Sequence, residues 1–224
     1  MGLAAWQSAD PGVQFDTTIN EWHTCPESGR IRASNPCSEY MFLDDTASNL
    51  ASLNLLAFRS TKDDFRIDEY QHAIRLWTIV LEISVLMAQF PSEEIAKKSY
   101  RYRTLGLGYA NLGGLLMASG LPYDSTEGRA LAGALTAVMT ATSYRTSAEM
   151  AEELGSFPGF QDNAQAMLKV MRNHQRAAHG LVEGYEGLTI LPVPLDIENC
   201  PISGLVEAAQ RSWDEAVEMG EAHG

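Results

Sequence analysis

The chain has 224 residues, of which 45% are hydrophobic and 20% are charged, an ordinary composition for a folded globular protein. The formal net charge of −13 argues against a nucleic-acid partner, because nucleic-acid-binding domains carry basic surfaces. Three cysteines are too few for a disulfide framework, so we expect a reducing, cytoplasmic location.

Residues 1–66 are rich in turn-forming residues, such as Asp10-Pro11-Gly12 and Asn35-Pro36. Two short runs in this segment, 13–17 and 51–58, could form strands. Loops held by a rigid scaffold carry function more often than helix interiors do. We therefore expect any chemistry to lie in this first quarter of the chain.

From residue 67 onward the hydrophobic pattern is helical. Ile67, Tyr70, Ile74, Trp77, Leu81 and Val85 recur at helical spacing before Pro91, which predicts a helix with these side chains turned inward. The most apolar stretch, 73–90, contains Arg75 and Glu82. It is therefore predicted to be a buried helix and not a membrane span.

The second half continues as helices with short connections. An apolar segment at 104–109 leads into a helix that ends near Met117. Asp124 and Glu127 form a capping box for a long alanine-rich helix that stops at Gly155.

Two more helices are predicted, with a possible extended piece at 190–195 between them. Asp162 is the expected cap of a helix that runs through Gln175. The last helix covers 202–219, and its inward side chains are Leu205, Val206, Ala209, Trp213 and Val217. We expect residues 67–224 to form the helical wall of the same domain as residues 1–66.

The motif with most chemical content is Asn35-Pro36-Cys37-Ser38-Glu39. If this stretch is extended, Asn35, Cys37 and Glu39 share one face and present an amide, a thiol and a carboxylate to one small molecule. The alternative is a surface loop with an incidental buried thiol, because a free cysteine often serves as a small hydrophobe. The spacing alone leaves both interpretations open.

Three other patterns have plain structural explanations beside their functional ones. Gly106-x-Gly108 lacks the third glycine of a dinucleotide loop, so close strand–helix packing competes with phosphate binding. His23 and Cys25 offer only half of a zinc site, and no metal is expected. His174 and His179 fit a solvated helix face or, alternatively, a partner contact.

Several segments together resemble one enzyme family. The run 35–47 (NPCSEYMFLDDTA), the upstream run 10–20 (DPGVQFDTTIN), residues 105–113 (LGLGYANLG) and residues 147–151 (SAEMA) occur in the order typical of that family. They resemble the large catalytic subunit of adenosylcobalamin-dependent ribonucleotide reductases. The resemblance extends over nearly the whole chain.

The resemblance implies an α/β fold: a mostly helical fragment of a ten-stranded α/β barrel with a radical-cysteine finger loop. An eight-stranded α/β barrel already takes about 250 residues, so this chain cannot close a ten-stranded one. The implied activity is that of a ribonucleoside-diphosphate reductase, an oxidoreductase that makes deoxyribonucleotides for DNA replication. We expect the isolated fragment to be inactive.

The resemblance also assigns roles to residues. Cys37 would carry a thiyl radical formed with adenosylcobalamin, Glu39 would act as the base, and Asn35 would hydrogen-bond the reacting sugar. The substrate-binding residues would be Ser34, Asn35, Pro36, Cys37, Ser38 and Glu39. The implied partners are a ribonucleoside di- or triphosphate, the remaining barrel segments and a thioredoxin-type reductant, with neither nucleic acid nor membrane.

One departure from the family pattern concerns the reductant. A redox cysteine is expected just before the run 49–55, but position 48 is Ser48. A serine cannot form a disulfide, so the usual route of reduction is in doubt. Cys25 could take over this role, or it could be a buried loop thiol. Two hypotheses follow: a part of a working reductase, or a non-catalytic remnant or interaction module.

Overall fold

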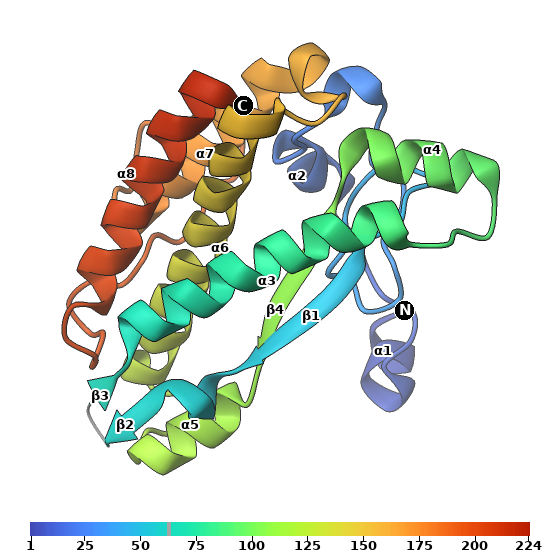
Figure 1. The fold of residues 1–224 in the computed structure, drawn as a ribbon. Coiled ribbons are helices and arrows are strands. Elements are labelled where there is room, and N and C mark those ends of the chain that lie inside the picture. The colour runs from blue at the N-terminus through green and yellow to red at the C-terminus, as the bar shows by residue number, and fades with distance from the viewer. Residues whose placement is uncertain (62–63) are drawn as a thin grey trace.

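The computed structural model describes residues 1–61 and 64–224 and is mostly helical (Figure 1). The helices in the first part of the chain are α1 (Gly2–Ser8), α2 (Asp16–Glu21), α3 (Ile67–Met87) and α4 (Glu93–Tyr102). Those in the second part are α5 (Leu112–Ser119), α6 (Thr126–Leu154), α7 (Phe160–Ala178) and α8 (Leu205–His223). The described residues form no closed barrel.

Two parallel strands run through the middle of the fold, β1 (Asn49–Asn54) and β4 (Leu105–Ala110). They pair in register from Asn49 opposite Leu105 to Asn54 opposite Ala110, and α3 is part of the crossover between them. The predicted strand at 51–58 is therefore correct only in its first half. The chain turns into a 3-10 helix at Leu55–Phe58, where the Asn54 side chain accepts a hydrogen bond from the Leu56 N–H.

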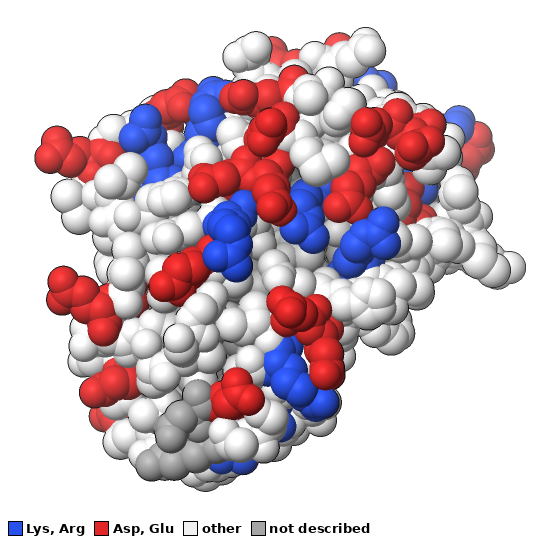
Figure 2. All heavy atoms as spheres, turned by 60° about the vertical axis from the view of Figure 1, so that its left-hand side comes forward, with Lys and Arg blue, Asp and Glu red and all other residues white. Residues whose placement is uncertain are grey.

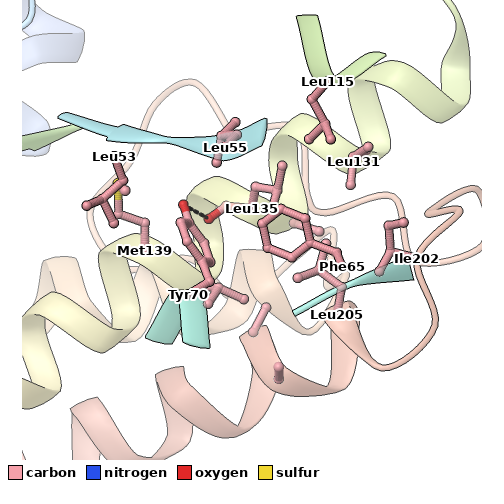
Figure 3. Packing of buried hydrophobic residues seen from close by; sticks show 14 of the residues in the cluster. Leu53, Leu55, Phe65, Tyr70, Leu115, Leu131, Leu135, Met139, Ile202 and Leu205 are labelled. Carbon is pink, nitrogen blue, oxygen red and sulfur yellow. Dashed lines mark hydrogen bonds between the residues drawn. The ribbon is translucent and has the colours of Figure 1, made fainter. Parts of the chain in front are cut away.

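A short antiparallel pair lies at one end of the molecule, β2 (Arg59–Thr61) with β3 (Asp64–Phe65). The main hydrophobic cluster lies between β1, this pair and helices α3, α5, α6 and α8 (Figure 3). Tyr70 is fully buried at its centre, and its hydroxyl donates to the Leu135 carbonyl at 3.4 Å. Side chains from 1–66 and from 67–224 thus share one core.

The α3 helix confirms the predicted span, but one of its predicted inward residues is wrong. Ile74 and Leu81 are buried, whereas Trp77 is 44% exposed. The inward row passes through Thr78, which is buried and donates to the Ile74 carbonyl, so Trp77 lies about 100° to the side. Within the described ranges, no helix combines the length and apolarity needed to cross a bilayer.

The later helices confirm the periodicity but shift two of the predicted caps. Ser125, and not Asp124, caps α6, because its hydroxyl accepts from the Gly128 N–H at 2.9 Å. Helix α7 begins at Phe160, two residues before Asp162, which lies in the first turn. All five side chains predicted to face inward from α8 are buried.

Three further differences concern single elements. Residues 13–15 have no regular structure and α2 begins at Asp16, so the strand predicted at 13–17 is wrong. Residues 190–195 form no strand. The α4 helix was not predicted because it lacks a long apolar row. Ser92 caps it, and Glu93 pairs with Lys97 one turn later.

Ion pairs connect helices α3, α6 and α8 on the surface. Arg75 of α3 meets Glu149 of α6 at 2.8 Å, and Arg145 of α6 meets Glu215 of α8 at 2.5 Å. Figure 2 shows acidic and basic side chains interspersed over one face of the molecule, without a broad basic area there. The excess negative charge is thus distributed over this face and partly paired.

Candidate functional site

The predicted motif forms a tight turn, not an extended strand. The Ser38 N–H donates to the Asn35 carbonyl at 3.0 Å, and Ser38 has a φ of 64°. Pro36 favours such a turn because its ring fixes φ near the value required at the second turn position. The expectation that alternation alone places the amide, thiol and carboxylate on one face is therefore wrong.

The turn leaves the thiol accessible. Cys37 is exposed, and Glu39 is also exposed. The burial that the alternative assumed for this thiol is thus wrong, whereas the surface loop that it also assumed is present. Asn35 is partly buried, and its Oδ1 accepts a hydrogen bond from the Tyr40 N–H at 3.0 Å. A backbone donor therefore fixes which end of the Asn35 amide is oxygen.

Two residues that the sequence did not single out hold this turn. The Gln14 side-chain amide donates to Ser34 Oγ at 3.3 Å and to Ser38 Oγ at 3.0 Å. The Tyr40 hydroxyl lies 2.9 Å from both Thr46 Oγ1 and Thr104 Oγ1. Gln14 therefore bonds two exposed or partly exposed serines of the turn, whereas Tyr40 connects the turn to Thr104, the residue before β4.

A cavity of about 780 Å³ opens beside the turn. Its wall includes Glu39 and Tyr40 from the loop, Glu82 of α3 and Arg103, together with apolar side chains of α3, α6 and β4. Arg103 and Glu82 form an ion pair whose side chains are only 12% and 23% exposed. A volume of this size is typical of sites for small molecules.

Comparison with known proteins identifies the family. The sequence matches the ribonucleotide reductase barrel domain over residues 1–224. The chain belongs to this family. It is 66% identical over 225 residues to the vitamin B12-dependent ribonucleotide reductase of Bradyrhizobium diazoefficiens, covering 100% of this chain and 18% of that protein. The family predicted from the sequence is therefore confirmed.

Proteins with the same name in other bacteria are also similar. The relative from Agrobacterium fabrum is 67% identical and covers 99% of this chain and 18% of its own length. The relative from Rhodopirellula baltica is 46% identical and covers 100% of this chain and 20% of its own length. The chain thus spans about a fifth of the length of these reductases.

Ser48 lies against β4. Its Oγ donates to the Asn49 carbonyl at 3.1 Å. A Cβ on Gly106 would lie 2.9 Å from that Oγ and 2.6 Å from a Leu50 methyl, and it would also collide with the Asn49 carbonyl oxygen. Close packing does require glycine at position 106, but the neighbour is strand β1 and not a helix as predicted.

Cys25 is a buried loop thiol. It is 2% exposed, and burial raises its pKa to about 11, far from the range of a reactive thiolate. The neighbouring His23 is also buried, and its Nδ1 accepts from the Cys25 N–H while Nε2 donates to the Gly29 carbonyl at 2.9 Å. Both ring nitrogens are occupied, so His23 has no nitrogen to offer a metal.

His174 differs from its prediction as a solvated residue. Its ring is stacked on Trp213 at 5.2 Å and packs against Trp22 at 4.9 Å. Burial lowers the pKa of His174 to about 4, because the charged ring would lose its hydration. His179 remains on the surface side and bonds Asp214 at 2.8 Å.

Proposed function

We propose that this chain supplies the radical loop of an adenosylcobalamin-dependent ribonucleotide reductase, which converts ribonucleotides to deoxyribonucleotides for DNA replication. The observation that carries the proposal is the exposed thiol of Cys37 in the Asn35–Glu39 turn, in a chain whose full length matches reductases. A thiol that must reach a substrate atom has to be accessible, and this one is.

Each of the three polar groups has a role in this proposal. The Cys37 thiyl radical takes a hydrogen atom from C3′ of the ribose, so an S–H bond forms as the C–H bond breaks. Glu39 takes the proton of the 3′-hydroxyl as a general base. Asn35 orients the sugar with its Nδ2, which makes no hydrogen bond among the described residues, while the Tyr40 N–H holds its Oδ1. Ser34, Pro36 and Ser38 complete the substrate contact.

The exposure of Cys37 also fits contact with a cofactor. We assign adenosylcobalamin because the relatives are named vitamin B12-dependent. The cofactor supplies the one-electron chemistry that converts the thiol into a radical. The chain contributes the thiol itself and the hydrogen bonds that hold its turn in place.

The fold supports a need for further barrel segments. Parallel sheets are normally covered on both faces, yet Leu50 of the two-stranded sheet is 72% exposed. The outer edges of β1 and β4 also lack partners among the described residues. These features support a single incomplete domain that completes a ten-stranded barrel, with residues 1–66 carrying the finger loop and 67–224 the helical wall.

The electrons for the second half of the reaction must come from a dithiol. Loss of the 2′-hydroxyl as water leaves a sugar that needs two electrons, and Ser48 cannot supply them. We propose a thioredoxin-type reductant acting through cysteines outside this chain. Free thiols at Cys25, Cys37 and Cys200 suit the reducing cytoplasm, where such a reductant works.

The similarity extends over the entire chain and does not favour the alternative of a non-catalytic remnant. The deciding experiment mixes the chain with the complementary segments of the Bradyrhizobium relative, adenosylcobalamin, a ribonucleoside di- or triphosphate and a chemical dithiol. Deoxyribonucleotide formation is measured. We expect product with the natural chain and none with Cys37→Ser, because a serine hydroxyl does not form the required radical.

Cys200→Ser is the matched control. Cys200 is partly buried near the start of α8 and its thiol contacts the Ile202 carbonyl, outside the turn. This variant should retain the product yield of the natural chain. Equal activity of Cys37→Ser and the natural chain would refute the radical role.

A further inference from the structure

Tyr40 is the residue directly after the candidate radical motif, and it makes hydrogen bonds through both its backbone N–H and its side-chain hydroxyl. Its backbone N–H donates to Asn35 Oδ1 at 3.0 Å. Its hydroxyl lies 2.9 Å from Thr46 Oγ1 and 2.9 Å from Thr104 Oγ1. Thr104 immediately precedes β4. One residue therefore connects the amide of the turn with the start of a central strand.

The directions of the hydroxyl contacts follow from the protons available. Thr46 donates its own hydroxyl proton to the Leu43 carbonyl at 2.5 Å, so its oxygen accepts the proton of Tyr40. Thr104 has one hydroxyl proton and two acceptors at 2.9 Å, the Tyr40 hydroxyl oxygen and the Ala47 carbonyl. Burial raises the pKa of Tyr40, which keeps the Tyr40 proton in place at neutral pH.

The other supports of the turn are more exposed. Gln14, which bonds Ser34 and Ser38, is exposed, and water competes for its hydrogen bonds. The Tyr40 ring is partly buried and packs near Phe42 at 6.1 Å, which in turn contacts Tyr102 at 5.5 Å. The link through Tyr40 is therefore the better shielded of the two connections.

We propose that Tyr40 is a positioning residue: it orients the Asn35 amide through its N–H and fixes the Cys37 turn to the start of β4 through its hydroxyl and Thr104. This inference rests on the proposed function for its effect on turnover. Small displacements of reacting groups have large effects on rate, about 100-fold for a misplacement of 1 Å. The ring itself need not touch the substrate.

The test uses Tyr40→Phe and Thr104→Val, which remove the hydroxyl link but keep similar volumes. In the complemented assay, both variants should lower kcat about tenfold with little change in KM, because the turn is misplaced while substrate contacts elsewhere remain. Thr104→Ser keeps the hydroxyl and should restore the rate. Tyr185→Phe is the control, since it removes a tyrosine hydroxyl bonded to the Leu181 carbonyl far along the chain.

A second measurement needs no catalysis. Amide hydrogen exchange of the 224-residue chain, followed by NMR at Ser38 and Tyr40, reports opening of the turn. Tyr40→Phe and Thr104→Val should raise exchange there by about threefold to tenfold, the factor that one neutral hydrogen bond contributes. Tyr185→Phe and Thr104→Ser should leave exchange at these two amides unchanged.

The two measurements separate the possible failures. If the natural chain gives no product, the proposed function fails, and the exchange rates alone decide whether Tyr40 holds the turn. Unchanged exchange in Tyr40→Phe overturns the anchoring. Faster exchange with unchanged kcat overturns the positioning role and leaves only a structural one. A rise in KM at constant kcat would instead make Tyr40 a substrate-binding residue, which also contradicts the proposal.

Discussion

At the scale of single residues, two glycines differ in the space that a Cβ atom would have. A Cβ at Gly106 would meet Ser48 Oγ at 2.9 Å and the Leu50 side chain at 2.6 Å, whereas a Cβ at Gly113 in α5 meets nothing within 4 Å. Gly106→Ala should therefore lower the free energy of unfolding by about 2 kcal/mol through overpacking. Gly113→Ala should raise it by about 0.5–1 kcal/mol through helix propensity. Urea unfolding of both variants checks this contrast.

His174 makes stability depend on pH. Its folded-state pKa of about 4 lies below that of an exposed histidine, so the unfolded chain binds a proton that the folded chain excludes. Above the unfolded-state pKa of about 6.5 both states hold a neutral histidine, and the free energy of unfolding is at its full value. As the pH falls from about 6.5 toward 4, protonation of the unfolded chain lowers the free energy of unfolding. Between pH 7.5 and 5.5 this loss amounts to about 1 kcal/mol.

Urea unfolding at these two pH values should show a smaller difference in His174→Gln, which has no proton to exclude. The comparison with the natural chain cancels the other titrating groups. An equal pH dependence in both proteins would mean that the ring between Trp22 and Trp213 is not shielded as its contacts indicate.

The residues of the candidate site were predictable by motif, but their arrangement was not. Asn35, Cys37 and Glu39 could be singled out because an amide, a thiol and a carboxylate stand close together in the sequence. The turn depends on Pro36 and on a positive φ at Ser38, which alternation rules do not consider. Tyr40 contacts Thr104, which is 64 positions later in the chain, and Gln14 contacts Ser38, which is 24 positions later. No local sequence pattern encodes these contacts.

At the scale of elements, the start of α6 tests the corrected cap. Ser125 accepts from the Gly128 N–H, so Ser125→Ala should lower the free energy of unfolding by about 1 kcal/mol. Asp124→Ala, at the cap predicted from sequence, should change it by less than about 0.5 kcal/mol. Thermal or urea unfolding distinguishes the two positions, and a larger effect at Asp124 would restore the original prediction.

Helices were predictable from sequence where a row of apolar side chains marks the buried face, and were missed where such a row is lacking. The α8 helix was located from its apolar row because that row is the buried face. The α4 helix is mostly polar, and its better signals were the cap at Ser92 and the Glu93–Lys97 pair. The strand predicted at 13–17 failed because β propensity is weak without a neighbouring strand to pair with.

At the scale of the whole molecule, α3 has two apolar faces. One contains buried residues such as Leu81, and the other exposes Leu76, Val80, Ile83 and Met87, between 45% and 78%. The exposed set recurs at intervals of four, three and four residues, the spacing of a helix-packing seam. This second face supports the proposal that further barrel segments cover the chain.

The two faces of α3 should respond differently to the same substitution. Leu81→Ala should lower the free energy of unfolding of the chain by about 2–4 kcal/mol, because it opens a cavity in the core. Ile83→Ala should change it by less than about 0.5 kcal/mol, since that side chain is 52% exposed. In the complemented assay, however, Ile83→Ala should weaken association with the remaining segments if they pack on this face. Unimpaired association of both Ile83→Ala and Val80→Ala would show that the seam stays uncovered in the assembled enzyme.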